Sequence, residues 1–172
     1  MIDVVLLTGG NLDPVAQTLA LARVALIEQV GPEKACSGVW ESEPWGFEAP
    51  QRFLNQVLVL QTQLEPLALL DTVQAIERRL GRVRDEVPTS ASRDGASGPT
   101  PAPRRYHSRP IDIDLLFYGD RIIDLPRLQI PHPLIAQRVF VLRPLAEVLP
   151  DYRHPVTGLT ARDMLEQLEH LG

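Results

Sequence analysis

The order of strand and helix signals along the chain is the feature that most constrains its fold. Apolar β-rich runs and segments of helical periodicity follow one another in the order βαββαβ. The expected strands cover residues 2–7, 35–43, 53–64 and 111–118, and the two expected helices begin at Pro14 and Pro66. This order is typical of an α+β, ferredoxin-like domain, in which an antiparallel sheet has two helices packed on one face.

Glycine and proline mark the predicted ends of the helices. Gly31-Pro32 ends the first helix, and Gly81 is expected at the C′ position of the second. Helical periodicity also predicts segments at residues 139–149 and 160–171, which would be C-terminal additions to the core.

Residues 85–103 interrupt the pattern, since these 19 residues contain four prolines, two glycines and three serines. Such a composition cannot pack a hydrophobic core. A linker between two domains is the alternative, but each flanking piece lacks half of the sheet. We therefore expect a flexible loop within one domain that spans residues 1–172.

The overall charge argues against a surface that binds nucleic acid, because 22 acidic and 17 basic residues give a formal charge of −5. The one cysteine, Cys36, can form no intrachain disulfide. No apolar stretch approaches the roughly 20 residues of a membrane span. The expectation is a cytoplasmic protein with neither a nucleic-acid nor a membrane partner.

Asp112 and Asp114 alternate with apolar residues in the last predicted strand, so both carboxylates point to one face of the sheet. Neighbouring carboxylates repel each other unless a cation lies between them. Two carboxylates that are completed by substrate phosphates are typical of a magnesium site. The alternative is an exposed acidic strand face.

Arginines lie on both sides of the proline-rich loop and ahead of this carboxylate strand, at Arg82, Arg84, Arg104, Arg105 and Arg109. The planar guanidinium group matches phosphate oxygens. Carboxylates for a metal beside arginines for phosphates suggest phosphoryl transfer, although the chain has no Gly-x-x-x-x-Gly-Lys phosphate loop. His132 is either a further phosphate contact or an ordinary loop residue.

Phe53 and Asn55 are predicted to share one face of a strand. An aromatic ring and an amide that both donates and accepts hydrogen bonds would suit a flat nitrogen heterocycle. The alternative is a core phenylalanine beside an asparagine near a turn.

Together these motifs resemble the 6-hydroxymethyl-7,8-dihydropterin pyrophosphokinase family. The resemblance extends over nearly the whole chain, and its most specific part is residues 109–119, with the sequence R-P-I-D-I-D-L-L-F-Y-G. It also includes Phe53-Leu54-Asn55 and Ile130-Pro131-His132-Pro133. It implies a ferredoxin-like enzyme of folate biosynthesis that transfers the pyrophosphoryl group of ATP to the pterin hydroxymethyl oxygen and releases AMP.

The resemblance also implies roles for individual residues. Asp112 and Asp114 would hold two Mg²⁺ ions on the triphosphate. The catalytic set would comprise these two aspartates with Arg82 and Arg109. ATP would be bound by Gln74, Glu77, Arg84, Arg109, His132 and Arg138. The pterin would be bound by Ser42, Pro44, Trp45, Phe53, Asn55 and Phe140. The expected partners are these two small substrates, and the expected assembly is a monomer.

The chain departs from the family pattern at a few positions. Gly10 stands where serine is common, and Tyr106 stands near the place of a common tryptophan.

Two other function classes use the same βαββαβ order. A ligand-sensing regulatory domain has no need for paired carboxylates beside arginines. An RNA-binding module would have exposed aromatic residues on the strand that instead contains Asp112 and Asp114.

Overall fold

The computed structural model describes residues 1–11, 14–42, 53–85 and 111–171, and of residues 82–85 and 171 the backbone alone. The strands are β1 (Ile2–Gly10), β2 (Glu33–Cys36), β3 (Trp40–Ser42), β4 (Phe53–Thr62), β5 (Asp112–Tyr118), β6 (Ile123–Leu125) and β7 (Leu128–Ile130). The helices are α1 (Val15–Gln29), α2 (Pro66–Asp85), α4 (Val139–Val148) and α5 (Ala161–Leu171), with a 3₁₀ turn at Ile135–Gln137.

The main sheet has the strand order β2-β4-β1-β5, with β3 also paired to β4, and its pairings are antiparallel. This order confirms the ferredoxin-like prediction, because the first strand lies between the third and fourth strands of the βαββαβ core. Strands β6 and β7 form a separate hairpin. The expected C-terminal additions are α4 and α5.

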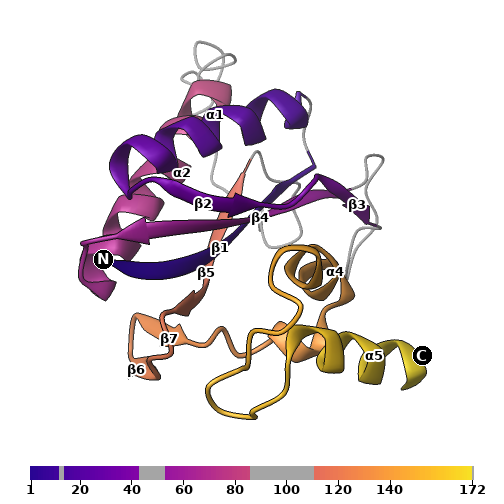
Figure 1. Ribbon diagram of the computed structural model, residues 1–172. Helices are drawn as coiled ribbons and strands as arrows, with labels where there is room; N and C mark the ends of the chain where they lie inside the picture. The colour runs from indigo at the N-terminus through magenta and orange to yellow at the C-terminus, as the bar shows by residue number, and fades with distance from the viewer. Residues whose placement is uncertain (12–13, 43–52, 86–110, 172) are drawn as a thin grey trace, which may run out of the picture.

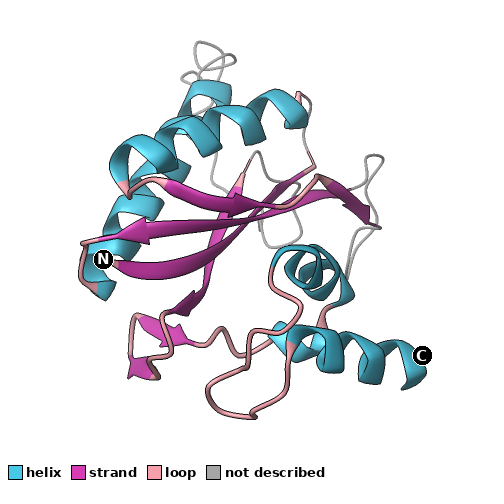
Figure 2. Ribbon diagram, in the orientation of Figure 1, coloured by secondary structure: helices cyan, strands magenta, loops and turns pink. Residues whose placement is uncertain are grey.

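Helices cover both faces of the sheet (Figure 1). Helices α1 and α2 pack on one face, as predicted, and α4 and α5 pack on the other, so that Figure 2 shows the strands between two helical layers. Within the described ranges, no helix is long and apolar enough to cross a membrane.

Residues of β1 alternate between the two cores. Val4 and Leu6 pack with α1 and α2, whereas Val5 and Leu7 pack with α4 and α5. All four side chains are buried. A strand that is covered on both faces is apolar throughout, which explains the unbroken Val4–Leu7 run.

Some elements differ from the prediction. The expected strand at 35–43 is two short strands with an irregular segment between them. Helix α2 continues past Gly81 to Asp85, because glycine weakens a helix by only about 1 kcal/mol and is tolerated inside it. The β6–β7 hairpin was not predicted, since strands of three residues are too short to give an alternating pattern. Apart from Asp85, the predicted loop at 85–103 lies outside the described residues.

Candidate active site

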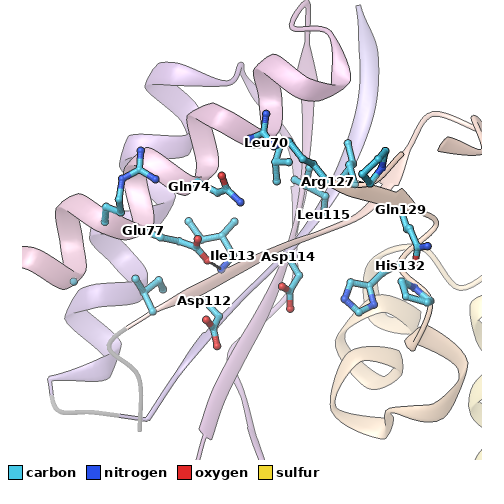
Figure 3. Close-up of a pocket in the computed structure, with 16 residues that line it drawn as sticks. Leu70, Gln74, Glu77, Asp112, Ile113, Asp114, Leu115, Arg127, Gln129 and His132 are labelled. Carbon is cyan, nitrogen blue, oxygen red and sulfur yellow. Dashed lines mark hydrogen bonds between the residues drawn. The ribbon is translucent and has the colours of Figure 1, made fainter. Parts of the chain in front are cut away.

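The two carboxylates that were predicted to share a face do so. Asp112 pairs with Gly9, and Asp114 pairs with Leu7, a residue of the core beneath α4 and α5. Directly opposed residues of antiparallel strands point to the same face. Both aspartates are half-buried and line a cavity of about 700 Å³. Figure 3 shows the two carboxylates on the same side of β5.

The walls of this cavity come from three separate parts of the chain. Helix α2 contributes Gln74 and Glu77, β5 contributes the aspartates, and the segment after β7 contributes His132 (Figure 3). The structure thus places these five residues around one cavity. Their side chains supply several polar groups to its lining.

A hydrogen bond to Glu77 links α2 to the edge strand β5. The backbone N–H of Ile113 donates to Glu77 Oε2 at 2.6 Å. Ile113 lies between the two aspartates in sequence, so this hydrogen bond fixes the backbone that positions both carboxylates. An edge strand otherwise presents unpaired amides to solvent.

His132 is held by two hydrogen bonds. Its backbone N–H donates to Leu116 O at 3.1 Å, and its Nδ1 accepts the N–H of Leu134 at 3.2 Å. The neutral ring therefore has its proton on Nε2. Burial, and secondarily the charge of Arg138, hold the pKa of His132 below its ordinary value. Such a ring is a neutral hydrogen-bond donor near pH 7.

A second polar cluster lies where β3 and β4 pair. Asn55 Nδ2 donates to Ser42 Oγ at 3.2 Å, and Ser42 lies opposite Phe53. Phe53 and Asn55 lie on the face of β4 that also carries Val57, beneath α4. Phe53 is half-buried.

Phe140 comes to the same region from α4. Its ring is half-buried, and the Arg138 guanidinium carbon lies 5.5 Å from the ring centroid. Phe140 packs against the core beneath α4, which includes Val57 of β4. The structure thus brings the predicted aromatic pair and the predicted asparagine to one face of the sheet.

Gly9 lies between the two clusters. It pairs with Asp112 on one side and with Asn55 on the other, and Asn55 in turn pairs with Trp40. A Cβ atom at Gly9 would lie 2.5 Å from Asn55 Oδ1, which is too close. No side chain therefore separates the aspartate from the asparagine along this row. Two strand spacings place their Cα atoms about 10 Å apart.

Five predicted site residues cannot be placed. Pro44, Trp45 and Arg109 lie outside the described residues, as do the side chains of Arg82 and Arg84 at the end of α2. Their roles stay predictions.

Sequence reasoning missed other residues that line the cavity, among them Leu70, Arg127 and Gln129. Leu70 comes from α2, and Arg127 and Gln129 come from the β6–β7 hairpin. Arg127 Nη2 donates to Asp71 Oδ1 at 2.5 Å, which joins the hairpin to α2. The stripe of apolar residues on α2 was a usable signal for Leu70. The hairpin residues gave none, because their location depends on packing between distant segments.

The donor set near the aspartates suits a hard cation. Among the described residues there is no group of three or more His, Cys, Asp and Glu side chains that could hold a metal unaided. Asp112 and Asp114 would therefore supply two oxygen ligands and leave the other positions to substrate or water. That is the usual mode of magnesium binding with phosphate substrates.

Comparison with known proteins adds independent information. A model of the 7,8-dihydro-6-hydroxymethylpterin-pyrophosphokinase family matches residues 5–150. The chain is 37% identical over 163 residues to the 2-amino-4-hydroxy-6-hydroxymethyldihydropteridine pyrophosphokinase of Synechocystis sp., a match that covers 94% of this chain and 73% of that protein. It is 40% identical over 156 residues to the Porphyromonas gingivalis protein of the same name, covering 90% and 95%.

The fold is also found among solved structures. The crystal structure of Plasmodium falciparum HPPK-DHPS with pteroate matches this chain with a TM-score of 0.70 and 17% sequence identity. The match covers 96% of this chain and 42% of that longer one. At this identity the likeness supports the fold alone.

Proposed function

Because the chain belongs to the 7,8-dihydro-6-hydroxymethylpterin-pyrophosphokinase family, we infer that it is a diphosphotransferase of folate biosynthesis. It transfers the pyrophosphoryl group of ATP to 6-hydroxymethyl-7,8-dihydropterin. The hydroxymethyl oxygen bonds to the β-phosphorus, the bond from that phosphorus to the bridging oxygen breaks, and AMP leaves with that oxygen. The hydroxyl proton is released.

One observation carries the assignment of the site. Asp112 and Asn55 share a row across the sheet with only Gly9 between them. A site for a charged, metal-bound triphosphate therefore lies beside a site for a flat heterocycle, on one face. Transfer between two substrates requires that arrangement, because most of the barrier reduction comes from positioning the reacting groups.

Asp112 and Asp114 would hold the magnesium ions, two of which are expected. Bound there, the metal supplies positive charge that offsets the charge of the triphosphate. The chain's own contribution is to keep two carboxylates on one face of β5. The Glu77 hydrogen bond to Ile113 supports this by fixing the intervening backbone.

The phosphates would extend along the cavity toward His132 and Arg138. His132 Nε2 would donate a hydrogen bond to a phosphate oxygen, since Nδ1 already accepts one, and Arg138 adds positive charge near the same ring. Gln74 and Glu77 line the α2 wall of the cavity, and we assign them to the nucleotide. We also assign Arg82, Arg84 and Arg109 to the phosphates, and Arg82 and Arg109 would act near the transferring group.

The pterin would lie between Phe53 and Phe140. Both rings are half-buried on the face beneath α4, which supports stacking on the two sides of a flat ring. The Asn55 amide would form hydrogen bonds with the edge of the ring, and its hydrogen bond to Ser42 holds this amide in place. Pro44 and Trp45 would complete this side.

Three further proposals concern the whole chain. Residues 1–172 act as one domain. The protein acts as a monomer. Because the reaction consumes ATP, we place it in the cytoplasm.

The direct test is incubation of the protein with ATP, Mg²⁺ and 6-hydroxymethyl-7,8-dihydropterin. We expect AMP and the pterin diphosphate in equal amounts, and none of either when a chelator removes the metal. Binding of the pterin without AMP formation would instead indicate a ligand-sensing domain. Formation of ADP would contradict pyrophosphoryl transfer.

A further inference from the structure

The strand that runs through β2 and β3 contains one extra residue. Cys36 pairs with Leu58 and Trp40 pairs with Asn55, so four steps along this strand oppose three along β4. A bulge of this kind leaves a backbone amide outside the ladder and changes which way the following side chains point. Ser37 still bonds to Val57 through both its N–H and its Oγ. The irregularity therefore lies at residues 38–39.

Glu147 of α4 takes up the amide that the bulge exposes. The N–H of Gly38 donates to its two carboxylate oxygens at 3.3 and 3.1 Å. The indole Nε1–H of Trp40 donates to Oε1 at 2.8 Å. Two donors on the bulged strand thus converge on one carboxylate of α4. Glu147 is 109 positions from Gly38 and 107 positions from Trp40 in sequence.

This contact joins the two sides of the proposed heterocycle site. On the sheet side, Trp40 lies opposite Asn55 in the ladder. On the helix side, Phe140 and Glu147 are seven residues apart, which places them on the same face of α4 two turns from each other. A shift of α4 relative to the bulged strand would therefore change the spacing between Phe140 and the strand pair that carries Phe53.

We propose that Glu147 is a positioning residue that sets this spacing and so determines how tightly the pterin binds. The proposal rests on the function proposed above. Glu147 touches neither reacting group, and it acts through Gly38 and Trp40. All three residues are exposed, so their hydrogen bonds add little to overall stability compared with their effect on local geometry.

Glu147→Gln is the informative variant, because it keeps the shape of the side chain. The amide has one accepting oxygen, and its NH₂ group would face an N–H donor. We expect the affinity for 6-hydroxymethyl-7,8-dihydropterin, measured with α,β-methylene-ATP and Mg²⁺ present, to fall about tenfold. Affinity for the ATP analogue alone should stay unchanged. Glu169→Gln removes a surface carboxylate of α5 that is paired with Arg143 of α4, so it is the matched control and should bind like the parent.

The fluorescence of Trp40 gives a second readout that a general loss of stability would not mimic. In a Trp45→Phe background, loss of the indole hydrogen bond should shift the Trp40 emission of the folded Glu147→Gln variant. In the Trp40→Phe background, Glu147→Gln should cost less pterin affinity than it does in the parent, because one of its partners is already gone.

The outcomes separate this proposal from the assignment of function. If the parent forms AMP and Glu147→Gln binds the pterin as tightly as the parent does, the positioning role is refuted and the function stands. An equal loss of affinity for pterin and for the ATP analogue would also refute it, since that result means a general loosening. A parent that binds pterin but forms no AMP refutes the function, and reduced pterin binding by Glu147→Gln would still support the positioning role.

Discussion

Asp112 and Asn55 lie in one row across the sheet, on opposite sides of Gly9. The glycine puts no side chain between an acidic side chain and an amide, and both of these groups stand on strands of the same sheet. Asn55 is buried, and its Nδ2 is already bound to Ser42. The amide therefore has a defined orientation before any ligand arrives, which reduces the entropy lost on binding.

Replacing Gly9 with alanine should disrupt this row. A Cβ atom would lie 2.5 Å from Asn55 Oδ1 and 3.3 Å from Leu54 O, so the amide must move. We expect at least a tenfold loss of pterin affinity by calorimetry, with overpacking costing about 1–3 kcal/mol of stability. Pterin binding by Gly9→Ala equal to the parent's would show that the close approach of Asn55 to Gly9 is not needed for pterin binding.

Asp112→Asn and Asp114→Asn test the metal site. Each change keeps the shape but removes a charge that would hold magnesium, so AMP formation at saturating Mg²⁺ should fall by about 100-fold or more. Thermal stability should hold or rise, because the change relieves repulsion between the two carboxylates. Asp120→Asn, an exposed aspartate two residues beyond β5, should leave turnover unchanged. Turnover of Asp112→Asn at the parent's rate would exclude a metal role for that residue.

Phe53→Ala and Phe140→Ala test the stacking site. Each should weaken pterin binding by about 1 kcal/mol, or about fivefold, through loss of an aromatic contact. Nucleotide binding in the absence of pterin should not change. Leu21→Ala removes a side chain that is 58% exposed on α1, over the opposite face of the sheet, and serves as the control. If neither phenylalanine variant loses pterin affinity, the heterocycle lies elsewhere.

The sequence was sufficient for features that depend on local spacing. Strand alternation placed Asp112 and Asp114 on one face, and the strand and helix order gave the ferredoxin-like core. It could not place Gly9 between Asp112 and Asn55, because that depends on the register of three strands distant in sequence. The same holds for the bulge at residues 38–39 and for its contact with Glu147. Neither Gly38 nor Glu147 belongs to a periodic pattern, and their contact spans 109 positions.

The pH dependence of nucleotide binding should depend on His132. Burial and Arg138 lower its pKa in the free protein, whereas a bound polyphosphate favours the imidazolium and raises it. Binding therefore takes up a proton. The affinity for ATP should rise as the pH falls through the bound-state pKa, and level off below the lower free-state pKa.

His132→Gln should keep the affinity seen at pH 8 and lose the gain at lower pH, since the amide donates a hydrogen bond but does not titrate. Calorimetry in buffers of different ionisation enthalpy measures the proton uptake directly. His154 also has a pKa lowered by burial, but it does not line the cavity. His154→Gln should therefore keep the parent's pH dependence of ATP affinity. If His132→Gln also kept it, a group other than His132 would be responsible for the proton uptake.

Glu77 provides the last test, because one of its oxygens accepts the N–H of Ile113 between the two aspartates. Glu77→Ala leaves this amide without that acceptor, which should cost about 1–3 kcal/mol of stability and loosen the backbone of both carboxylates. The Mg²⁺ concentration needed for half-maximal AMP formation should then rise severalfold. Glu77→Gln retains an accepting oxygen and should restore both stability and Mg²⁺ dependence. A Glu77→Ala protein with the parent's Mg²⁺ dependence would show that α2 does not position the aspartates, and a deficit shared by Glu77→Gln would indicate that the charge itself is required.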